Sequence, residues 1–227
     1  MGRAMKIYRR LYARFGAQGW WPTYNSRSGR IEYRRGKFRK LAEPEKLEIA
    51  IGAILAQNTN WKNAEKAVVG LIKRNKMNVS KIAEMNESDL GKIIRPSGYF
   101  RQKAHRLKIF CSHLLKNYGG KIGKMYEKEI RELRCELLSL HGIGPETADS
   151  IILYSAQKPS FVIDAYTFRL NDELKLLKLE SKTHHKRYGE LKSYFERSLP
   201  PDVRLFQEYH ALIVEWGKRN PKARVKN

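Results

Sequence analysis

One acidic residue in the second half of the chain has the setting of a reactive group. Asp164 follows the apolar run Phe161-Val162-Ile163 and stands where a helix is expected to begin. An aspartate at that place caps the helix with its side chain. The positive end of the helix also helps to keep the carboxylate ionised, so a structural cap and a catalytic anion are both open interpretations.

A glycine-containing segment upstream of Asp164 could hold a phosphate. Residues 140–154 read LHGIGPETADSIILY, so that Gly142 and Gly144 form a tight turn between one helix and a second that begins at Pro145. Glycine lets the backbone approach a large ligand closely. The exposed N–H groups at the start of the second helix then form an anion site. An ordinary turn between two helices has the same pattern, so the motif alone does not decide.

Together these segments resemble a known family. LHGIGPETADSIILY followed by FVIDAYTFRL is similar to the helix-hairpin-helix motif, Gly/Pro-rich loop and aspartate of the endonuclease III superfamily of DNA glycosylases. The spacing of 18 residues from Glu146 to Asp164 matches that family. Upstream, LEIAIGAILAQNTNWKNAEKAV and IRPSGYFRQKAHRL resemble its two DNA-inserting segments. The similarity covers about residues 40–175.

The resemblance implies roles for particular residues. Asp164 is expected to be the catalytic carboxylate, and Gly142 and Gly144 are expected to bring backbone amides to a DNA phosphate. Gln57 and Tyr99 are expected to fill the space left by a nucleotide flipped out of the duplex. The family also implies a structural monovalent cation, Na⁺ or K⁺, at the backbone carbonyls of Leu138, Leu140 and Ile143.

Two departures from the family pattern change the expected chemistry. Bifunctional members carry a lysine at the hairpin position where this chain has Glu146. Without that amine no Schiff base forms there, so we expect hydrolysis and no AP-lyase activity. Asp164 is then expected to direct water to C1′ and to stabilise the developing oxocarbenium charge. With only Cys111 and Cys135 present, we expect no iron–sulfur cluster and no other cofactor.

Three of the four tryptophans bear on which base is removed. Trp20 and Trp21 precede Pro22, and Trp61 follows residues 57–60. This layout resembles the 3-methyladenine DNA glycosylases of the superfamily, which also have Glu at the hairpin position. Alkylated purines are cationic, and stacking on an indole face stabilises a cation by roughly 0.5–2 kcal/mol. We therefore expect Trp61 to stack on the flipped base and Trp20, Trp21 and Pro22 to line its pocket, although tryptophan is more often a core residue.

Two other functions stay open. A glycosylase of the same fold could act on uracil or thymine in mismatches, or on oxidised guanine, with Asn58 or Asn60 against the Watson–Crick edge of the base. A non-enzymatic helix-hairpin-helix protein would bind the DNA backbone alone. Three histidines near these segments, His141, His184 and His185, are expected to be surface or structural residues.

The composition favours a nucleic-acid partner. The chain of 227 residues carries 46 Lys and Arg against 23 Asp and Glu, a formal net charge of +23. Such a surplus points to phosphate backbones. Residues 1–40 hold 12 basic residues and one acid, Glu32, and the segment after Glu215 holds five basic residues and no acid. Both ends are therefore expected to lie near DNA, where counterion release contributes affinity.

The same composition excludes other classes. A hydrophobic content of 41% with 11% aromatic residues argues against a disordered chain. No run of 18 apolar residues predicts a membrane span, and residues 1–16 lack the apolar core of a secretory signal. We expect a monomer in the cytoplasm, associated with the nucleoid if the source is prokaryotic. Its expected partner is double-stranded DNA that contains a damaged base.

Helices must position these residues. Apolar residues with helical periodicity follow Pro44. Ser80 and Asn86 are candidate N-caps of further helices, and a long helix is expected to end at Gly119. Further helices are predicted over residues 128–140, 184–198 and 203–216. No strand pattern extends beyond a few residues, the best being 160–163.

The sequence thus predicts an all-α fold of two helical lobes with the active site in the cleft between them. Residues 1–43 and 156–227 are expected to form a discontinuous lobe from both termini. Residues 44–155 are expected to form a helical barrel that contains the helix-hairpin-helix at about residues 133–155.

Overall fold

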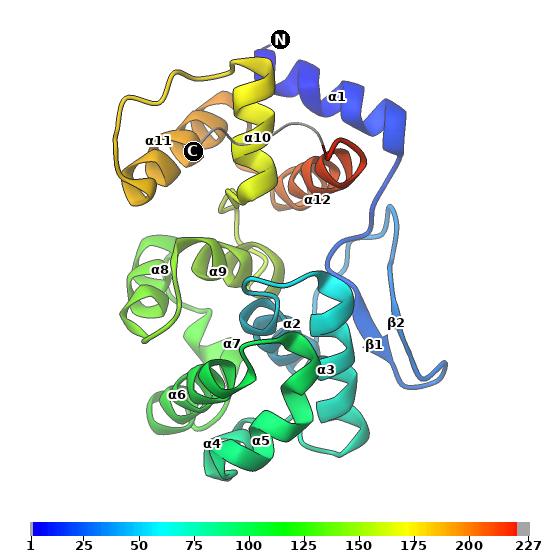
Figure 1. Ribbon diagram of the computed structural model, residues 1–227, viewed down its shortest axis with the longest axis vertical. Helices are drawn as coiled ribbons and strands as arrows, with labels where there is room; N and C mark the ends of the chain where they lie inside the picture. The colour runs from blue at the N-terminus through cyan, green and yellow to red at the C-terminus, as the bar shows by residue number, and fades with distance from the viewer. Residues whose placement is uncertain (1, 222–227) are drawn as a thin grey trace. The chain divides into compact units, whose positions relative to one another are not determined.

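The computed structural model describes residues 2–221, and almost all of their regular secondary structure is helical (Figure 1). The predicted all-α class is confirmed. The exception is a short antiparallel hairpin of β1 (Thr23–Asn25) and β2 (Arg30–Glu32). This hairpin could not be predicted from the sequence, because three residues per strand are too few to show an alternating pattern. No helix in this described part is long and apolar enough to cross a membrane.

Internal contacts divide the chain into two units. Unit 1 consists of Met1–Trp21, Tyr33–Phe38 and Lys158–Asn227, and unit 2 consists of Pro22–Glu32 and Arg39–Gln157. This division departs from the predicted boundaries, which assigned residues 156–157 and the longer segments 22–32 and 39–43 to the lobe of the termini.

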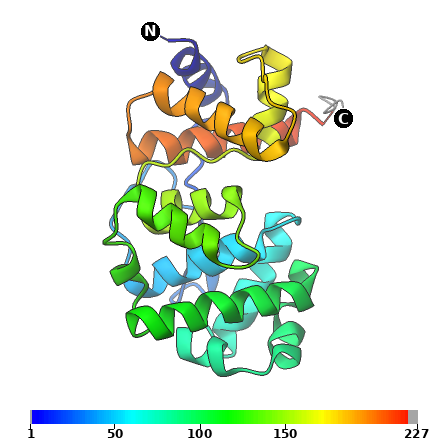
Figure 2. The same cartoon turned by 90° about the vertical axis from the view of Figure 1, so that its left-hand side faces the viewer.

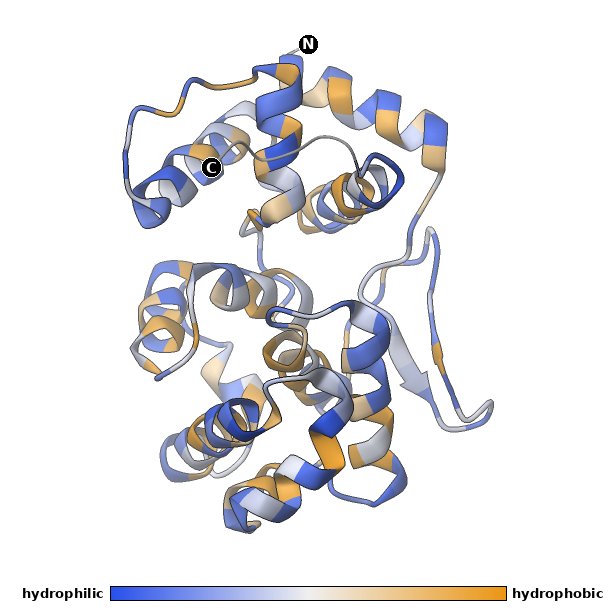
Figure 3. Ribbon diagram, in the orientation of Figure 1, coloured by the Kyte–Doolittle hydropathy of each residue, from blue (hydrophilic) through white to orange (hydrophobic). Residues whose placement is uncertain are grey.

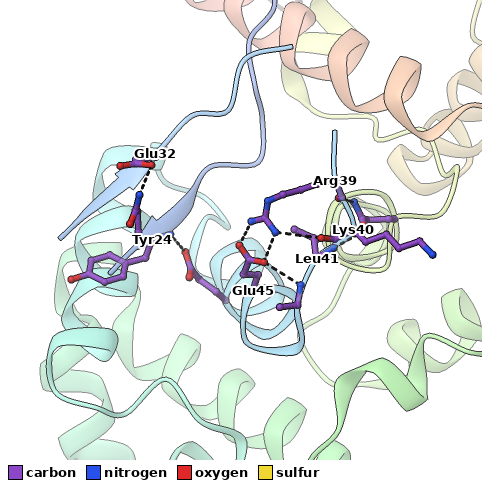
Figure 4. Close-up of polar contacts among 10 residues, drawn as sticks. Tyr24, Glu32, Arg39, Lys40, Leu41 and Glu45 are labelled. Atoms are coloured by element: carbon purple, nitrogen blue, oxygen red, sulfur yellow. Dashed lines mark hydrogen bonds and ion pairs between the residues drawn. The ribbon is translucent and has the colours of Figure 1, made fainter. Parts of the chain in front are cut away.

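Polar contacts to α2 (Glu43–Leu55) explain why these segments belong to unit 2. The backbone N–H of Tyr24 in β1 donates to Oε1 of Glu48 at 2.7 Å, and Glu48 is buried. The guanidinium of Arg39 donates to both carboxylate oxygens of Glu45 (Figure 4). The hairpin and the segment before α2 are thereby attached to a helix of unit 2.

Unit 1 has an aromatic core. The rings of Phe161 and Phe195 stack with centroids 4.3 Å apart, and Tyr209 meets both edge-on. The Tyr209 hydroxyl donates to the carbonyl of Ala4 at 2.9 Å, which ties the N-terminal helix to this core. The helices of the unit are α1 (Arg3–Phe15), α10 (Ala165–Leu174), α11 (His184–Ser198) and α12 (Val203–Arg219).

Unit 2 is built around α2, which is buried without interruption from Leu47 to Leu55 and is largely hydrophobic in Figure 3. The long helix α6 (Phe100–Tyr118) contacts α2 and runs alongside α4 and α5 (Figure 2). The other elements are α3 (Trp61–Lys73), α4 (Val79–Glu84), α5 (Glu87–Ile94), the 3₁₀ helix η1 (Arg95–Ser97), α7 (Ile122–Met125), α8 (Ile130–Ser139), α9 (Pro145–Ser150) and the π-helical turn η2 (Ile151–Ser155).

Most predicted helix ends are found, and one is corrected. Asn86 caps α5 as expected, accepting the N–H of Ser88, and Gly119 ends α6 in the left-handed region. The cap of α4, however, is Asn78 rather than Ser80, because the Asn78 side chain accepts the N–H of Lys81. Both residue types cap well, so the sequence alone could not choose between them.

Residues 160–163, the best strand candidate, are buried but belong to no described strand. Side chains of α11 supply part of their hydrogen bonding. The N–H of Phe161 donates to Oε1 of Glu196 at 2.9 Å, and that of Ile163 donates to the Tyr188 hydroxyl at 3.4 Å. This segment leads directly into Asp164.

Candidate active site and DNA-binding hairpin

Asp164 is the N-cap of α10. Its Oδ1 accepts the backbone N–H of Thr167 at 2.7 Å and the Thr167 hydroxyl at 2.8 Å. The Thr167 hydroxyl oxygen in turn accepts the N–H of Asp164 at 3.4 Å, which completes a capping box. The side chain is only 12% exposed, so the carboxylate is held in one orientation at a sheltered place.

His210 of α12 is the neighbour of Asp164 that sequence analysis missed. Its Nε2 lies 3.7 Å from Oδ2 of Asp164, an ion-pair distance that is too long for a hydrogen bond. Burial by itself raises the pKa of Asp164, but His210 and the bonds from Thr167 outweigh burial and hold that pKa below its usual value. Asp164 is therefore an anion at neutral pH. The only signal in the sequence was a lone histidine at the start of an apolar run.

Unit 1 contains a cavity of about 200 Å³ that is lined in part by α12, the helix that carries His210. Trp20, which the sequence predicts to line the base pocket, is one of the residues around this cavity. The Nζ of Lys218 lies 6.0 Å from the Trp20 ring centroid, so one cation already faces this indole. The lining residues are Gln18, Trp20, Tyr33, Arg35, Ala211, Val214, Glu215 and Lys218.

Close packing of two segments of unit 1 positions Trp20. A Cβ on Gly19, whose φ is +70°, would lie 2.5 Å from the backbone nitrogen of Arg35, so only glycine fits there. Oε1 of Glu208 accepts the N–H of Gln18 at 2.6 Å. Burial raises the pKa of Glu208, although backbone hydrogen bonds from Gln18 and Gly19 oppose this shift.

The other predicted pocket residues are distributed over both units. The Trp21 ring lies 5.1 Å from that of Trp20, centroid to centroid, so the structure brings these two together. Pro22 is buried and begins the segment of unit 2 that forms the β1–β2 hairpin. Trp61 is the first residue of α3 and is half-buried.

The predicted helix-hairpin-helix is formed by α8, the turn after it and α9. Asp149 of α9 is fully buried, and Arg134 of α8 donates to both of its oxygens at 2.9 and 3.1 Å. This bidentate pair fixes the angle between the two helices. Gly142 has a φ of +84°, which favours glycine, and Gly144 is the N-cap of α9. Glu146 is exposed in the first turn of α9.

The two predicted DNA-inserting residues differ in their surroundings. Tyr99 is 65% exposed with a φ of +44°. The Gln57 amide donates to the carbonyl of Gly142 at 2.9 Å and to the hydroxyl of Thr147 at 2.8 Å. Its Oε1 accepts from Arg106 at 2.6 Å. Gln57 therefore attaches the end of α2 to the hairpin, and it must break these bonds before it can enter a duplex.

The carbonyls predicted to hold a cation lie at the start of this turn. Leu138 is in the last turn of α8, where carbonyl groups lack partners within the helix. The carbonyl of Leu140 accepts the N–H of Ile143 at 3.0 Å. Carbonyl oxygens are ligands of the kind that hard cations prefer, so the three residues fit such an ion in chemical type.

The other residues named from the sequence are a helix cap and exposed residues. Asn60 caps α3 by accepting the N–H of Asn63, whereas Asn58 is exposed with a φ of +50°. Three histidines, His141, His184 and His185, are exposed, as expected for surface residues. Basic residues of the C-terminal segment at positions 222, 224 and 226 lie outside the described residues.

Comparison with known proteins assigns the family. A model of the HhH-GPD superfamily of base excision DNA repair proteins matches residues 51–197. A protein of Methanocaldococcus jannaschii, provisionally named a DNA repair glycosylase, is 39% identical over 216 residues, which cover 94% of this chain and 86% of the relative. This chain belongs to the HhH-GPD superfamily. The endonuclease III of Thermotoga maritima is 28% identical over 181 residues, covering 80% and 77% of the two chains.

Solved structures agree with this assignment. The H. pylori 3-methyladenine DNA glycosylase bound to 1,N6-ethenoadenine superposes with a TM-score of 0.74 and 25% identity, covering 96% of this chain and 98% of that one. A thermostable thymine-DNA glycosylase superposes with a TM-score of 0.58 at 20% identity, covering 78% and 77%, which shows the fold alone. The predicted resemblance is confirmed, and membership of the HhH-GPD superfamily supports DNA glycosylase activity in general terms.

The two hairpin glycines give a matched pair for mutagenesis. Gly142→Ala should destabilise the protein by about 2 kcal/mol, because it places a Cβ in the left-handed region and 2.5 Å from the Arg106 side chain. Gly144→Ala should cost less than about 1 kcal/mol, because no atom lies within 4 Å of the added Cβ and φ is negative. Urea unfolding of both variants measures the difference, and equal losses would show that the turn is not constrained at Gly142.

Proposed function

We propose that this protein is a monofunctional DNA N-glycosylase of base excision repair. It flips a damaged base out of duplex DNA and hydrolyses its N-glycosyl bond, acting in the cytoplasm or on the nucleoid, where such DNA lies. The observation that carries the proposal is the ionised, sheltered carboxylate of Asp164 at the start of α10.

The geometry of Asp164 suits this reaction. Departure of the base leaves positive charge on the sugar, and a fixed anion stabilises that charge without reorganisation. Thr167 occupies Oδ1, so Oδ2, on the side of His210, is the oxygen that directs water to C1′. His210 is then a positioning residue that keeps Asp164 ionised.

Hydrolysis without strand cleavage follows from the hairpin. Glu146 stands in the first turn of α9 at the position where bifunctional relatives carry the lysine that attacks C1′. A carboxylate forms no Schiff base, so β-elimination lacks its covalent intermediate there. The product of the proposed reaction is therefore an intact strand with an abasic site.

We propose alkylated purines such as 3-methyladenine as the substrate class. The paired indoles of Trp20 and Trp21 offer faces on which a cationic purine can stack. The family resemblance alone supports Trp61 as a further residue that stacks on the flipped base. A cationic purine is also a good leaving group, so one carboxylate suffices and no second acid is required. Support comes from the H. pylori glycosylase, which acts on 3-methyladenine and covers nearly the whole chain.

One observation favours a second substrate class. Arg35 and Lys218 line the cavity beside Trp20, and both side chains are positively charged groups that can donate hydrogen bonds. Such donors suit the carbonyl oxygens of uracil, thymine or oxidised guanine and repel a cationic base. A thymine-DNA glycosylase of Aeropyrum pernix, 24% identical over 187 residues that cover 82% of this chain, is a relative of that type.

Contacts to DNA are proposed for the hairpin and for the two loops. Gly142 and Gly144 present backbone amides to a phosphate, and Tyr99 and Gln57 fill the space of the flipped nucleotide. The carbonyls of Leu138, Leu140 and Ile143 would hold the monovalent cation, which would bring positive charge to the same phosphate.

Asp164→Asn tests the catalytic assignment. Asparagine is an equally good N-cap, so the fold and the duplex affinity should be retained while base release falls by about 10²–10³-fold or more. Chromatography of bases released from methylated duplex DNA measures the rate, and titration of the same DNA measures affinity. Turnover at the parent rate would remove Asp164 from its role. Binding by both proteins without release of any damaged base would favour a non-enzymatic DNA-binding protein.

Borohydride reduction tests the absence of lyase chemistry. Incubation of the protein with lesion-containing DNA and sodium borohydride should give no covalent adduct, because no imine forms at Glu146. Glu146→Lys supplies the missing amine and is the matched positive control, for which an adduct is expected on denaturing gels. An adduct with the parent protein would contradict the monofunctional assignment.

A further inference from the structure

A buried lysine in unit 2 has no part in the chemistry proposed above. Lys103 of α6 is 1% exposed, and its ammonium donates to the carbonyl of Leu55 at 2.8 Å and to that of Ser97 at 2.6 Å. Burial, with a contribution from Arg106, lowers the pKa of Lys103 to about 8. Burying a charged side chain is costly, so the two bonds are required to keep it there.

The two carbonyls belong to segments far apart in the sequence. Leu55 is the last residue of α2, and residues 56–60 after it connect α2 to α3. Ser97 is the last residue of η1, and Gly98 and Tyr99 follow it before α6 begins. We name residues 56–60 the first loop and residues 97–99 the second loop. One ammonium group thus bridges the starts of both loops.

Both loops expose one residue with a left-handed backbone. Asn58 in the first loop has a φ of +50°, and Tyr99 in the second has a φ of +44° and is 65% exposed. Such conformations are unfavourable for residues other than glycine and persist where the surrounding structure fixes them. In the second loop, the buried hydroxyl of Ser97 adds a bond to the carbonyl of Ile94 at 2.8 Å.

A second residue of α6 continues the same arrangement. Arg106 lies one turn after Lys103, and it donates to Oε1 of Gln57 in the first loop at 2.6 Å. Gln57 in turn donates to the hairpin carbonyl of Gly142. The inner face of α6 therefore connects both loops and the hairpin through hydrogen bonds. Of these three side chains, Lys103 alone bonds both to the residue that precedes the first loop and to the second loop.

We propose that Lys103 is a positioning residue that holds the two loops at a fixed separation, so that both enter the duplex together when the nucleotide is flipped. The inference rests on the DNA binding of the proposed function and on no particular lesion. An apolar side chain at position 103 would leave two carbonyls without donors and the loops without a common anchor. Loss of Lys103 should then impair distortion of the duplex more than it impairs binding to it.

The test measures base unstacking in a protein that cannot excise. All variants are made in the Asp164→Asn background. The probe is a duplex with 2-aminopurine next to a tetrahydrofuran abasic analogue. Lys103→Met should lower the fluorescence increase at saturating protein by about fivefold or more, since stacking of inserted side chains is lost. Affinity for undamaged duplex should change by less than about threefold, since phosphate contacts dominate it.

Lys108→Met is the matched control. Lys108 lies on the same helix and also donates to a backbone carbonyl, that of Met85 at 2.5 Å, which belongs to neither loop. The Lys108→Met variant should keep the full fluorescence increase. Lys103→Arg can donate to both carbonyls and should restore at least about half of the signal that Lys103→Met loses. A merely structural lysine would affect unfolding while leaving the signal of folded protein unchanged.

A second measurement reports the loops directly. Spin labels at Asn58→Cys and Tyr99→Cys, with Cys135→Ser to remove the exposed native thiol, give the distance distribution between the loops. The distribution should broaden with Lys103→Met and stay narrow with Lys108→Met. If Lys103→Met does not fold, Lys103→Gln takes its place, since glutamine keeps N–H donors but is too short to reach both carbonyls.

The outcomes separate the two proposals. If the Asp164→Asn protein gives no fluorescence increase at all, the proposed function fails. If it gives one that the Lys103 substitutions leave unchanged, with an unchanged distance distribution, the positioning role is overturned.

Discussion

A carboxylate that stays ionised while largely buried is the constraint on which unit 1 depends. Asp164 caps α10, and the cap orients Oδ1 toward Thr167 and Oδ2 toward His210. The second contact requires α12 to pack tightly on α10. A Cβ at Gly217 would lie 2.1 Å from the Tyr166 ring, so this packing depends on a glycine. The geometry that stabilises the helix start is therefore the same geometry that presents the anion we propose for catalysis.

In unit 2, side chains that donate to backbone carbonyls perform the corresponding task. Lys103 and Gln57 each bond to at least one carbonyl of a segment remote in sequence, and the Arg134–Asp149 pair fixes the two helices of the hairpin. Loops carry many carbonyl groups that no helix or sheet can satisfy. Buried donors satisfy them and at the same time fix the positions of loops that are expected to touch DNA.

Features encoded within short segments could be predicted from the sequence, and features that join distant segments could not. The cap at Asp164, the glycine turn and the extent of α6 depend on local patterns of residues. His210 and Lys103 gave no such signal, because each matters through a partner far away in the chain. For the same reason the sequence did not predict that Arg35 and Lys218 lie beside Trp20, because the cavity brings together residues near both ends of the chain. The structure does not place residues 22–32 in the lobe of the termini as predicted, because Tyr24 bonds to Glu48, which lies on a later helix.

The most direct measurement is release of free base from duplex DNA containing methylated purines, uracil or 8-oxoguanine, assayed side by side. We expect that 3-methyladenine and 7-methylguanine are released and that the strand stays intact. Release of uracil or 8-oxoguanine alone would keep the Asp164 chemistry and assign the cavity with Arg35 and Lys218 to a neutral base. Release of none of these bases would contradict the account.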